Sequence, residues 1–201
     1  MEISIYTGGF AATNGYLVQT EEACILFDAP GGIKEWIDTQ GIKITHLILT
    51  HQHWDHVDDA SYFDDVEIYA FADHSEDLIL QKQAKENWGI PLDVQPFEVT
   101  KKLKHKEEFT IGDVHFKAFH VPGHSPDSLA FFCKEEEMCI AGDALFEGSI
   151  GRTDLPGGDH DQLIESIQKH LYTLPKETTV FPGHGPDTTI IDEKKSNPFT
   201  K

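Results

Sequence analysis

Short apolar and alternating runs recur along this chain, and they predict a protein built mainly from β-strands. In the first half, such runs predict strands at residues 3–6, 16–18, 24–27, 46–50 and 67–70. In the second half they predict strands near residue 111 and at 114–121, 128–133, 137–141 and 179–181, with 179–181 as the last strand. Glycines 8 and 9 end the opening strand, and charged turns separate most of the others.

Apolar residues at helical spacing predict helices between several of these strands. They are expected at residues 34–40, 57–63, from about 73 to 84, and 159–174. The last is the clearest, because Asp159 and Gln162 resemble a capping box at its start. A similar order of elements recurs after residue 108, and no linker rich in Gly, Pro or Ser interrupts the chain. We therefore expect one domain covering residues 1–201.

Composition and charge exclude several kinds of partner. The net charge is −19, from 16 basic and 35 acidic residues, which argues against a nucleic-acid surface and against docking on anionic membranes. No apolar run reaches the ~18 residues of a membrane span, and we find no signal peptide. Cys24, Cys133 and Cys139 lie in apolar or strand-like runs, where an odd number predicts free thiols. These features favour a cytoplasmic protein acting on a small molecule, of unpredicted oligomeric state.

Residues 50–56, Thr-His-Gln-His-Trp-Asp-His, carry the most concentrated chemistry in the chain. If the preceding strand continues through them, His51 and His53 point to one side and Gln52 to the other. A helix that begins at about Trp54 would then bring Asp55 and His56 back to the same point. Imidazole and carboxylate groups are ligands for zinc, manganese or iron. The alternative is three surface histidines and a helix-capping aspartate, which such tight packing of donors disfavours.

Three further donors each follow an apolar strand and stand beside glycine. They are His124 in Pro-Gly-His, Asp143 in Gly-Asp, and His184 in a second Pro-Gly-His. Glycine next to a ligand lets the backbone turn sharply and approach closely. Together with the first cluster they give seven donors, which is too many for one tetrahedral ion and suits two metals that share a carboxylate. Asp28, at the end of a strand, either caps the following turn or supports the ligands from behind.

The order of these residues resembles the metallo-β-lactamase superfamily over essentially the whole chain. The resemblance implies an α+β fold, the four-layer αββα sandwich, with two divalent metal ions at one edge, zinc foremost and iron or manganese as alternatives. It implies that the first ion is held by His51, His53 and His124, and that the second is held by Asp55, His56 and His184. Asp143 would bridge the two ions, where the zinc β-lactamases themselves differ by having cysteine.

Residues 149–159 and the Asn-Pro-Phe at 197–199 are similar to short glyoxalase II-like hydrolases, which cleave hydroxyacyl-glutathione thioesters. Full-length glyoxalase II enzymes grip glutathione with an extra helical C-terminal domain, and residues 1–201 are expected to be too short to include one. Arg152 falls where the family often places a basic residue against glutathione, although Thr153 and Asp154 depart from the usual pattern. Arg152 is therefore expected either to contact substrate or to pair with Asp154. Lys101, Lys102 and Lys104 are candidates for the same basic patch.

The implied reaction is thioester hydrolysis by a metal-bridging hydroxide, with catalytic roles for Asp55 and Asp143. Trp54 and Phe146 either wall the pocket or pack in the core. One rival is a mononuclear iron persulfide dioxygenase of the same fold, which would use His51, His124 and Asp143. A second rival is a binding module without activity, but such a protein would be expected to have lost ligands, and this chain keeps all seven.

Overall fold

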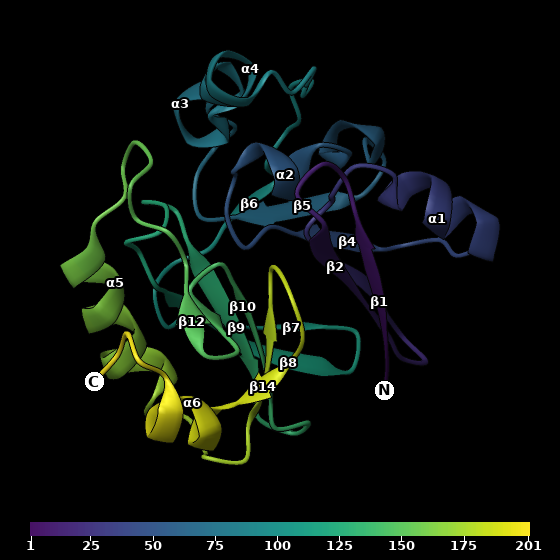
Figure 1. The fold of residues 1–201 in the computed structure, drawn as a ribbon. Coiled ribbons are helices and arrows are strands. Elements are labelled where there is room, and N and C mark those ends of the chain that lie inside the picture. Colours follow the sequence, from purple (N-terminus) through teal and green to yellow (C-terminus); the bar gives the residue numbers. More distant parts are fainter.

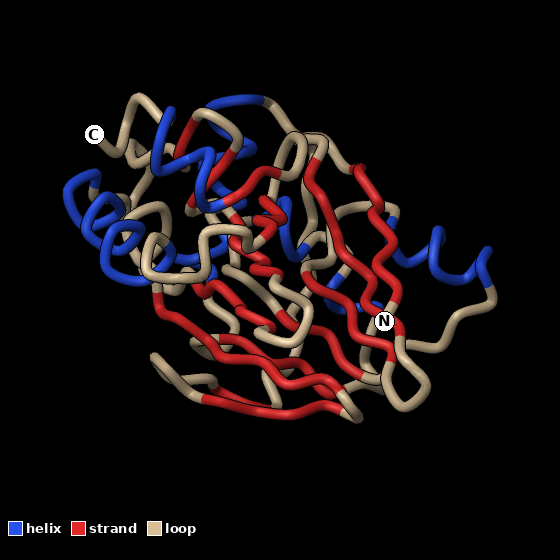
Figure 2. The backbone as a smooth tube through the Cα atoms, turned by 90° about the horizontal axis from the view of Figure 1, so that it is seen from below, coloured by secondary structure: helices blue, strands red, loops and turns tan.

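Two β-sheets of six strands each lie face to face at the centre of the structure, and helices cover their outer faces (Figure 1, Figure 2). The computed structural model describes residues 1–201. The first sheet has the strand order β1 (Glu2–Gly8), β2 (Thr13–Gln19), β3 (Cys24–Phe27), β4 (His46–Ile48), β5 (Glu67–Ala70), β6 (Lys101–Lys102). The second has the order β14 (Thr188–Thr189), β13 (Thr179–Pro182), β10 (Met138–Gly142), β9 (Leu129–Cys133), β8 (Val114–His120), β7 (Glu108–Ile111).

Helices fill the connections outside the two sheets. They are α1 (Ile33–Gln40), α2 (Trp54–Val57), α3 (Glu76–Ile79), α4 (Gln81–Trp88), α5 (His160–Ser166) and α6 (Ile190–Ser196), with a 3₁₀ turn at Ala60–Tyr62 and a π turn at Ile167–Leu171. A small hairpin, β11 (Leu145–Phe146) and β12 (Ser149–Ile150), stands apart from both sheets. None of the helices is long and apolar enough to cross a membrane.

Both sheets combine antiparallel and parallel pairs, and β14 pairs with β13 in antiparallel orientation at the edge of the second sheet. Strands β1, β2 and β3 form an antiparallel meander, and β4, β5 and β6 then join in parallel. In the second sheet β7 to β10 form a meander, and β13 pairs with β10 in parallel. Parallel neighbours end at the same edge of a sheet, so the loops that follow β3, β4, β10 and β13 can meet there.

Three separate apolar clusters divide the molecule into four layers. The middle cluster joins the sheets through Phe27 of β3, whose ring centroid lies 5.4 Å from those of Phe116 and Phe131 in the second sheet. A second cluster packs the first sheet against α1 and α2, and a third packs the opposite sheet against α5 and α6. Central strands are buried on both faces, which explains their unbroken apolar runs. The predicted α+β, four-layer αββα sandwich is confirmed.

Several predicted boundaries are wrong, each for a local reason. The helix expected at 57–63 is divided between α2 and the 3₁₀ turn, because Asp59 turns away to accept hydrogen bonds from the N–H groups of Gly32 and Lys34. The helix expected from 73 to 84 is broken at Leu80, whose φ is +57°. The strand at 179–181 is not the last, because β14 and α6 follow it. Runs as short as β11, β12 and β14 carry no usable periodicity.

Candidate metal centre

The first four donors lie where β4 gives way to α2. Strand β4 ends at Ile48, earlier than predicted, so His51 and His53 stand in a loop rather than in a ladder. Their rings nonetheless lie 4.6 Å apart by centroid, and the Gln52 amide points away, donating hydrogen bonds to two backbone carbonyls beyond β5. Helix α2 begins at Trp54, as predicted. Its first turn brings Asp55 and His56 back towards the same centre.

The other three donors come from the second sheet. His124 lies in the loop after β8, Asp143 directly follows β10, and His184 follows β13. Because β10 and β13 are parallel neighbours, Asp143 and His184 meet, with the His184 Nε2 3.4 Å from Asp143 Oδ2. Gly183 permits this approach, since a Cβ there would lie 2.0 Å from Asp143 Oδ1. The prediction that glycine beside a ligand allows a close approach of the backbone is therefore confirmed at Gly183.

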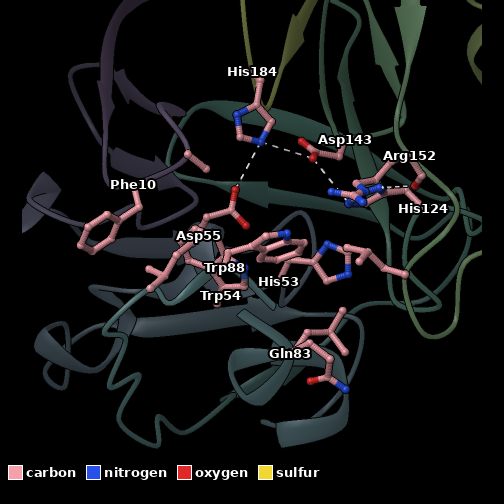
Figure 3. A pocket seen from close by; sticks show the side chains of 14 residues that line it. Phe10, His53, Trp54, Asp55, Gln83, Trp88, His124, Asp143, Arg152 and His184 are labelled. Atoms are coloured by element: carbon pink, nitrogen blue, oxygen red, sulfur yellow. Dashed lines mark hydrogen bonds and ion pairs between the residues drawn. The ribbon is translucent and has the colours of Figure 1, made fainter. Parts of the chain in front are cut away.

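The structure brings all seven predicted ligands into one cluster (Figure 3). Three overlapping groups have donor atoms within 4.8 Å of one another: His51, His53 and His124; His51, His56 and Asp143; Asp55, His56 and His184. Asp143 lies between the outer two groups. Its carboxylate is 3.4 Å from His124 Nε2 on one side and 3.3 Å from His56 Nε2 on the other. The cluster is suited to two metal ions.

Hydrogen bonds behind three histidines fix which ring nitrogen faces the centre. His56 Nδ1 donates to Asp28 Oδ2 at 2.8 Å, and His124 Nδ1 donates to the carbonyl of Arg152 at 2.8 Å. The Thr50 hydroxyl donates to Asp28 and therefore accepts from His51 Nδ1 at 3.1 Å. Each ring thus keeps a proton on Nδ1 and directs Nε2 inward. Burial opposes the charged form of His56, but the Asp143 and Asp55 carboxylates raise its pKa well above the usual value, so its Nε2 offers a lone pair only when a cation displaces the proton. Asp28 supports the ligands from behind, which was one of the two roles expected for it.

The inward atoms approach one another across the centre but form no hydrogen bond. The Nε2 atoms of His51, His56 and His124 and the Oδ1 of Asp143 are buried and have no hydrogen-bond partner. A buried polar atom that lacks a hydrogen bond costs about 1–3 kcal/mol. Four such atoms in one cluster indicate a site for a ligand that accepts lone pairs. Divalent cations with nitrogen and oxygen ligands are such a group. The residues present fit two metal ions.

The histidines of the cluster differ in their tendency to carry a proton. Burial lowers the pKa of His53 to about 3 and takes that of His51 well below its usual value. Burial also opposes the charged form of His184, but contacts with the Asp143 and Asp55 carboxylates outweigh it and raise its pKa to about 10. Without a cation, protonated histidines such as His184 balance the negative charge of the Asp55 and Asp143 carboxylates. Binding of a cation would displace those protons.

Several supporting residues left no signal in the sequence. The Thr13 hydroxyl donates to Asp55 Oδ2 at 2.8 Å. Asn14 donates to the carbonyls of Pro182 and Gly185 at 3.1 and 2.9 Å and so holds the loop that carries His184. The buried Asp127 accepts from the N–H of Gln52 at 3.0 Å, between the first two histidines. These partners lie far apart along the chain, so no motif or period predicts them.

Beside the cluster lies a cavity of about 260 Å³ that Arg152 and Trp54 help to line. The Arg152 guanidinium pairs with Asp154 at 2.7 and 2.8 Å, which was one of the two roles expected for it. Its contact with a substrate stays a prediction. The predicted lysine patch is wrong: none of the three lysines lines the cavity, and Lys101 and Lys102 pair with Glu107 and Asp73 instead. Phe146 is not part of the wall either, although its ring centroid lies 6.1 Å from that of His184.

A fold of this kind carries one group of donors after a strand of the first sheet and a second group after strands of the other, and it defines a class of metal-dependent enzymes. The first group is His51, His53, Asp55 and His56, and the second is His124, Asp143 and His184. The sequence profile of the metallo-β-lactamase superfamily matches residues 8–184, and the chain belongs to this superfamily.

Relatives within the superfamily include several hydrolases. The chain is 36% identical over 198 residues to the "probable metallo-hydrolase YqgX" of Bacillus subtilis, covering 92% of this chain and 91% of the relative. It is 34% identical over 196 residues to the "hydroxyacylglutathione hydrolase GloC" of Haemophilus influenzae, covering 92% of each.

Two solved structures are also closely similar. The BLEG-1 B3 metallo-β-lactamase superposes with a TM-score of 0.88 at 32% identity and covers all of both chains. TTHA1623 in a di-iron-bound form superposes with a TM-score of 0.83 at 36% identity, covering 98% of this chain and 99% of that one. The predicted superfamily is confirmed.

Proposed function

We propose that this protein is a metal-dependent thioesterase that hydrolyses hydroxyacyl-glutathione thioesters. The observation that carries the proposal is the set of four buried inward atoms without a hydrogen bond, three imidazole Nε2 and one carboxylate oxygen. Two of the four residues, His124 and Asp143, also line the neighbouring cavity. The resemblance of 34% to a hydroxyacylglutathione hydrolase supports the substrate class.

The proposed centre holds one ion through His51, His53 and His124 and a second through Asp55, His56 and His184, with Asp143 between them. The di-iron form of a relative supports two ions, and zinc is the metal we propose first. Two such ions would supply an activated water molecule and would polarise the thioester carbonyl. Water adds its oxygen to the acyl carbon, the C–S bond breaks, and the sulfur leaves as a thiol.

Residues of the chain would position the reaction rather than supply a nucleophile. Asp55 is held by the Thr13 hydroxyl at 2.8 Å and lines the cavity, so its carboxylate is placed to orient the attacking water. Asp143 also lines the cavity and contacts histidines of both groups. Burial lowers the pKa of the His53 ring to about 3, which favours its neutral, metal-binding form at neutral pH.

The experiment is the release of free thiol from S-lactoylglutathione after the protein has been stripped of metal and reloaded with zinc, manganese or iron. We expect hydrolysis that requires metal and falls by at least about 10²-fold in Asp55→Ala and His124→Ala. Asp38→Asn, on the exposed face of α1, is the matched control and should retain activity.

A mononuclear iron persulfide dioxygenase is the rival tested by the same protein. It would use His51, His124 and Asp143, which lie in the same cluster as the other four donors, so the products and the required metal distinguish the two reactions. Oxygen consumption with glutathione persulfide and iron, in a protein that leaves the thioester intact, would replace the thioesterase proposal.

A further inference from the structure

The cavity beside the candidate metal centre has very few polar groups apart from the ligands themselves. Fourteen residues line it, and five of the polar ones are the predicted ligands His53, Asp55, His124, Asp143 and His184. Only Gln83 and Arg152 remain as polar side chains that a substrate could contact away from the metals. The rest of the wall is apolar: Phe10, Ala11, Trp54, Leu80, Trp88, Ile90 and Leu155.

Arg152, the one cation of this wall, is already engaged. Its guanidinium forms two hydrogen bonds with Asp154 and lies over the Trp88 ring, 5.5 Å from the centroid. No lysine lines the cavity. A glutathione group carries two carboxylates and an ammonium, and the lining offers too few charges to bind them all. The thiol half of a glutathione thioester is therefore poorly matched to this wall.

Two large aromatic side chains stand exposed at the cavity. Phe10, in the turn between β1 and β2, is 64% exposed, and Trp88, the last residue of α4, is 44% exposed. They belong to segments far apart in the sequence, yet both line the same cavity, beside the buried Trp54 (Figure 3). Exposed aromatic groups that gather at one cavity mark a surface that binds an apolar partner.

We propose that Phe10, Trp88 and the apolar residues between them form an acyl-binding wall, and that the enzyme recognises its substrate through an apolar acyl group. This inference rests on the proposed thioesterase function and narrows its substrate class. The favoured substrates are thioesters of 2-hydroxy acids that carry an aromatic or branched aliphatic group, rather than the methyl group of lactate. The thiol half contributes less to binding.

The size of the effect follows from the area that an apolar acyl group buries. Covering a phenyl-sized group should raise kcat/KM by about 10- to 100-fold over a methyl group in the same position. The cavity, at about 260 Å³, is slightly smaller than the roughly 300–1,000 Å³ typical of ligand sites. It accommodates a compact acyl group more readily than a whole tripeptide.

The first test compares S-mandeloylglutathione with S-lactoylglutathione, two substrates that differ only by phenyl in place of methyl. We expect the metal-loaded protein to prefer the mandeloyl thioester by about tenfold or more in kcat/KM. Phe10→Ala and Trp88→Ala should each reduce this ratio several-fold. Phe199→Ala removes another exposed aromatic that does not line the cavity, and it should leave the ratio unchanged.

A second comparison tests whether the substrate preference depends on the acyl half or on the thiol half of the thioester. Replacing glutathione by the small neutral thiol N-acetylcysteamine, with the acyl group held constant, should change kcat/KM by less than about threefold. A much larger loss would mean that the thiol half carries recognition, and the acyl-wall proposal would then be wrong. A mandeloyl-to-lactoyl ratio of one or less, or a ratio that survives in both aromatic variants, would also overturn it.

The binding of compounds that cannot be hydrolysed tests the acyl-binding wall independently of the proposed thioesterase activity. S-benzylglutathione and S-methylglutathione are thioethers that cannot be hydrolysed, and their binding can be followed by tryptophan fluorescence. We expect the benzyl compound to bind at least about tenfold more tightly, and Phe10→Ala to remove the difference. If no thioester is hydrolysed but this difference is found, the thioesterase proposal fails while the apolar wall stands. Equal binding of the two compounds contradicts the wall even if hydrolysis occurs.

Discussion

Asp28 Oδ2 accepts a hydrogen bond from His56 Nδ1 at 2.8 Å, and both residues are buried. The same carboxylate accepts hydrogen bonds from the N–H and the hydroxyl of Thr50, which in turn accepts from His51. One aspartate behind the centre therefore orients ligands on both sides of it.

Asp28→Asn should weaken metal binding without unfolding the protein. Asparagine tolerates the left-handed backbone at this position, where φ is +59°, but its amide cannot accept all three hydrogen bonds. We expect a loss of metal affinity of about 10- to 100-fold, measured by competition with a chromophoric chelator. Asp38→Asn serves as the control, because its carboxylate pairs only with Lys34 on the surface of α1. Unchanged affinity in the Asp28 variant would show that this network does not tune the ligands.

Gly183→Ala should disrupt the centre from the backbone side. The added methyl group would lie 2.0 Å from Asp143 Oδ1 and 2.7 Å from His56 Cε1, so two candidate ligands must move. We expect fewer than two metal ions per chain by elemental analysis. Gly185→Ala, two residues along in the same loop, meets no neighbouring atom, although its φ of +75° carries some strain. If both variants lose metal equally, backbone strain rather than the clash is responsible.

Removal of metal should lower thermal stability. The unfolded chain has no preformed centre, so ions that bind only the native state stabilise it in proportion to the logarithm of their concentration over Kd. We expect the unfolding midpoint to fall on chelation and to recover on reloading. In Asp143→Ala the shift on chelation should be much smaller. An equal shift in that variant would indicate that the ions bind elsewhere.

The aromatic contact between the sheets should dominate stability away from the centre. Phe27 is fully buried and contacts Phe116 and Phe131 across the interface. Phe27→Ala should lower the free energy of unfolding by about 3–5 kcal/mol, determined from urea denaturation. Phe199→Ala, at a side chain that is 49% exposed, should change it by less than about 0.5 kcal/mol.

The three cysteines should be unreactive in the folded protein. All are free thiols; burial raises the pKa of Cys139 to about 12 and also raises those of Cys24 and Cys133. A raised pKa leaves little of the reactive thiolate at neutral pH. Reaction with a disulfide reagent at pH 7 should therefore be slow, should quicken as the pH rises, and should reach three thiols per chain only after denaturation. Rapid modification at pH 7 would contradict this.

Local patterns were enough to predict the donors, because each lies in a short motif at the end of an apolar run. His51 to His56 and the two Pro-Gly-His turns are visible without knowledge of the fold. What supports them was not predictable, since the contacts from Thr13 to Asp55 and from His124 to the Arg152 carbonyl join distant segments through single hydrogen bonds. The roles of the ligands, the extent of one domain and the absence of nucleic-acid partners remain predictions.

The secondary structure was likewise predictable where local patterns determine it, and not where tertiary contacts do. Long strands such as β8 and the capped helix α5 were located from periodicity and from Asp159, whose carboxylate accepts from the Gln162 N–H at 2.9 Å. The break at Leu80 depends on packing, because a leucine with a positive φ is stable only when its surroundings hold it there. Such tertiary effects override the local preference of the sequence.

The spacing of the donors along the chain has a consequence for biosynthesis. His51, His53, Asp55 and His56 are made early, whereas His124, Asp143 and His184 follow much later and belong to the other sheet. A nascent chain that has just released its first sheet can offer only part of the coordination set. All seven candidate ligands are therefore available only after residue 184 has been made and both sheets have docked, and a chain that stops before residue 184 would have an incomplete set.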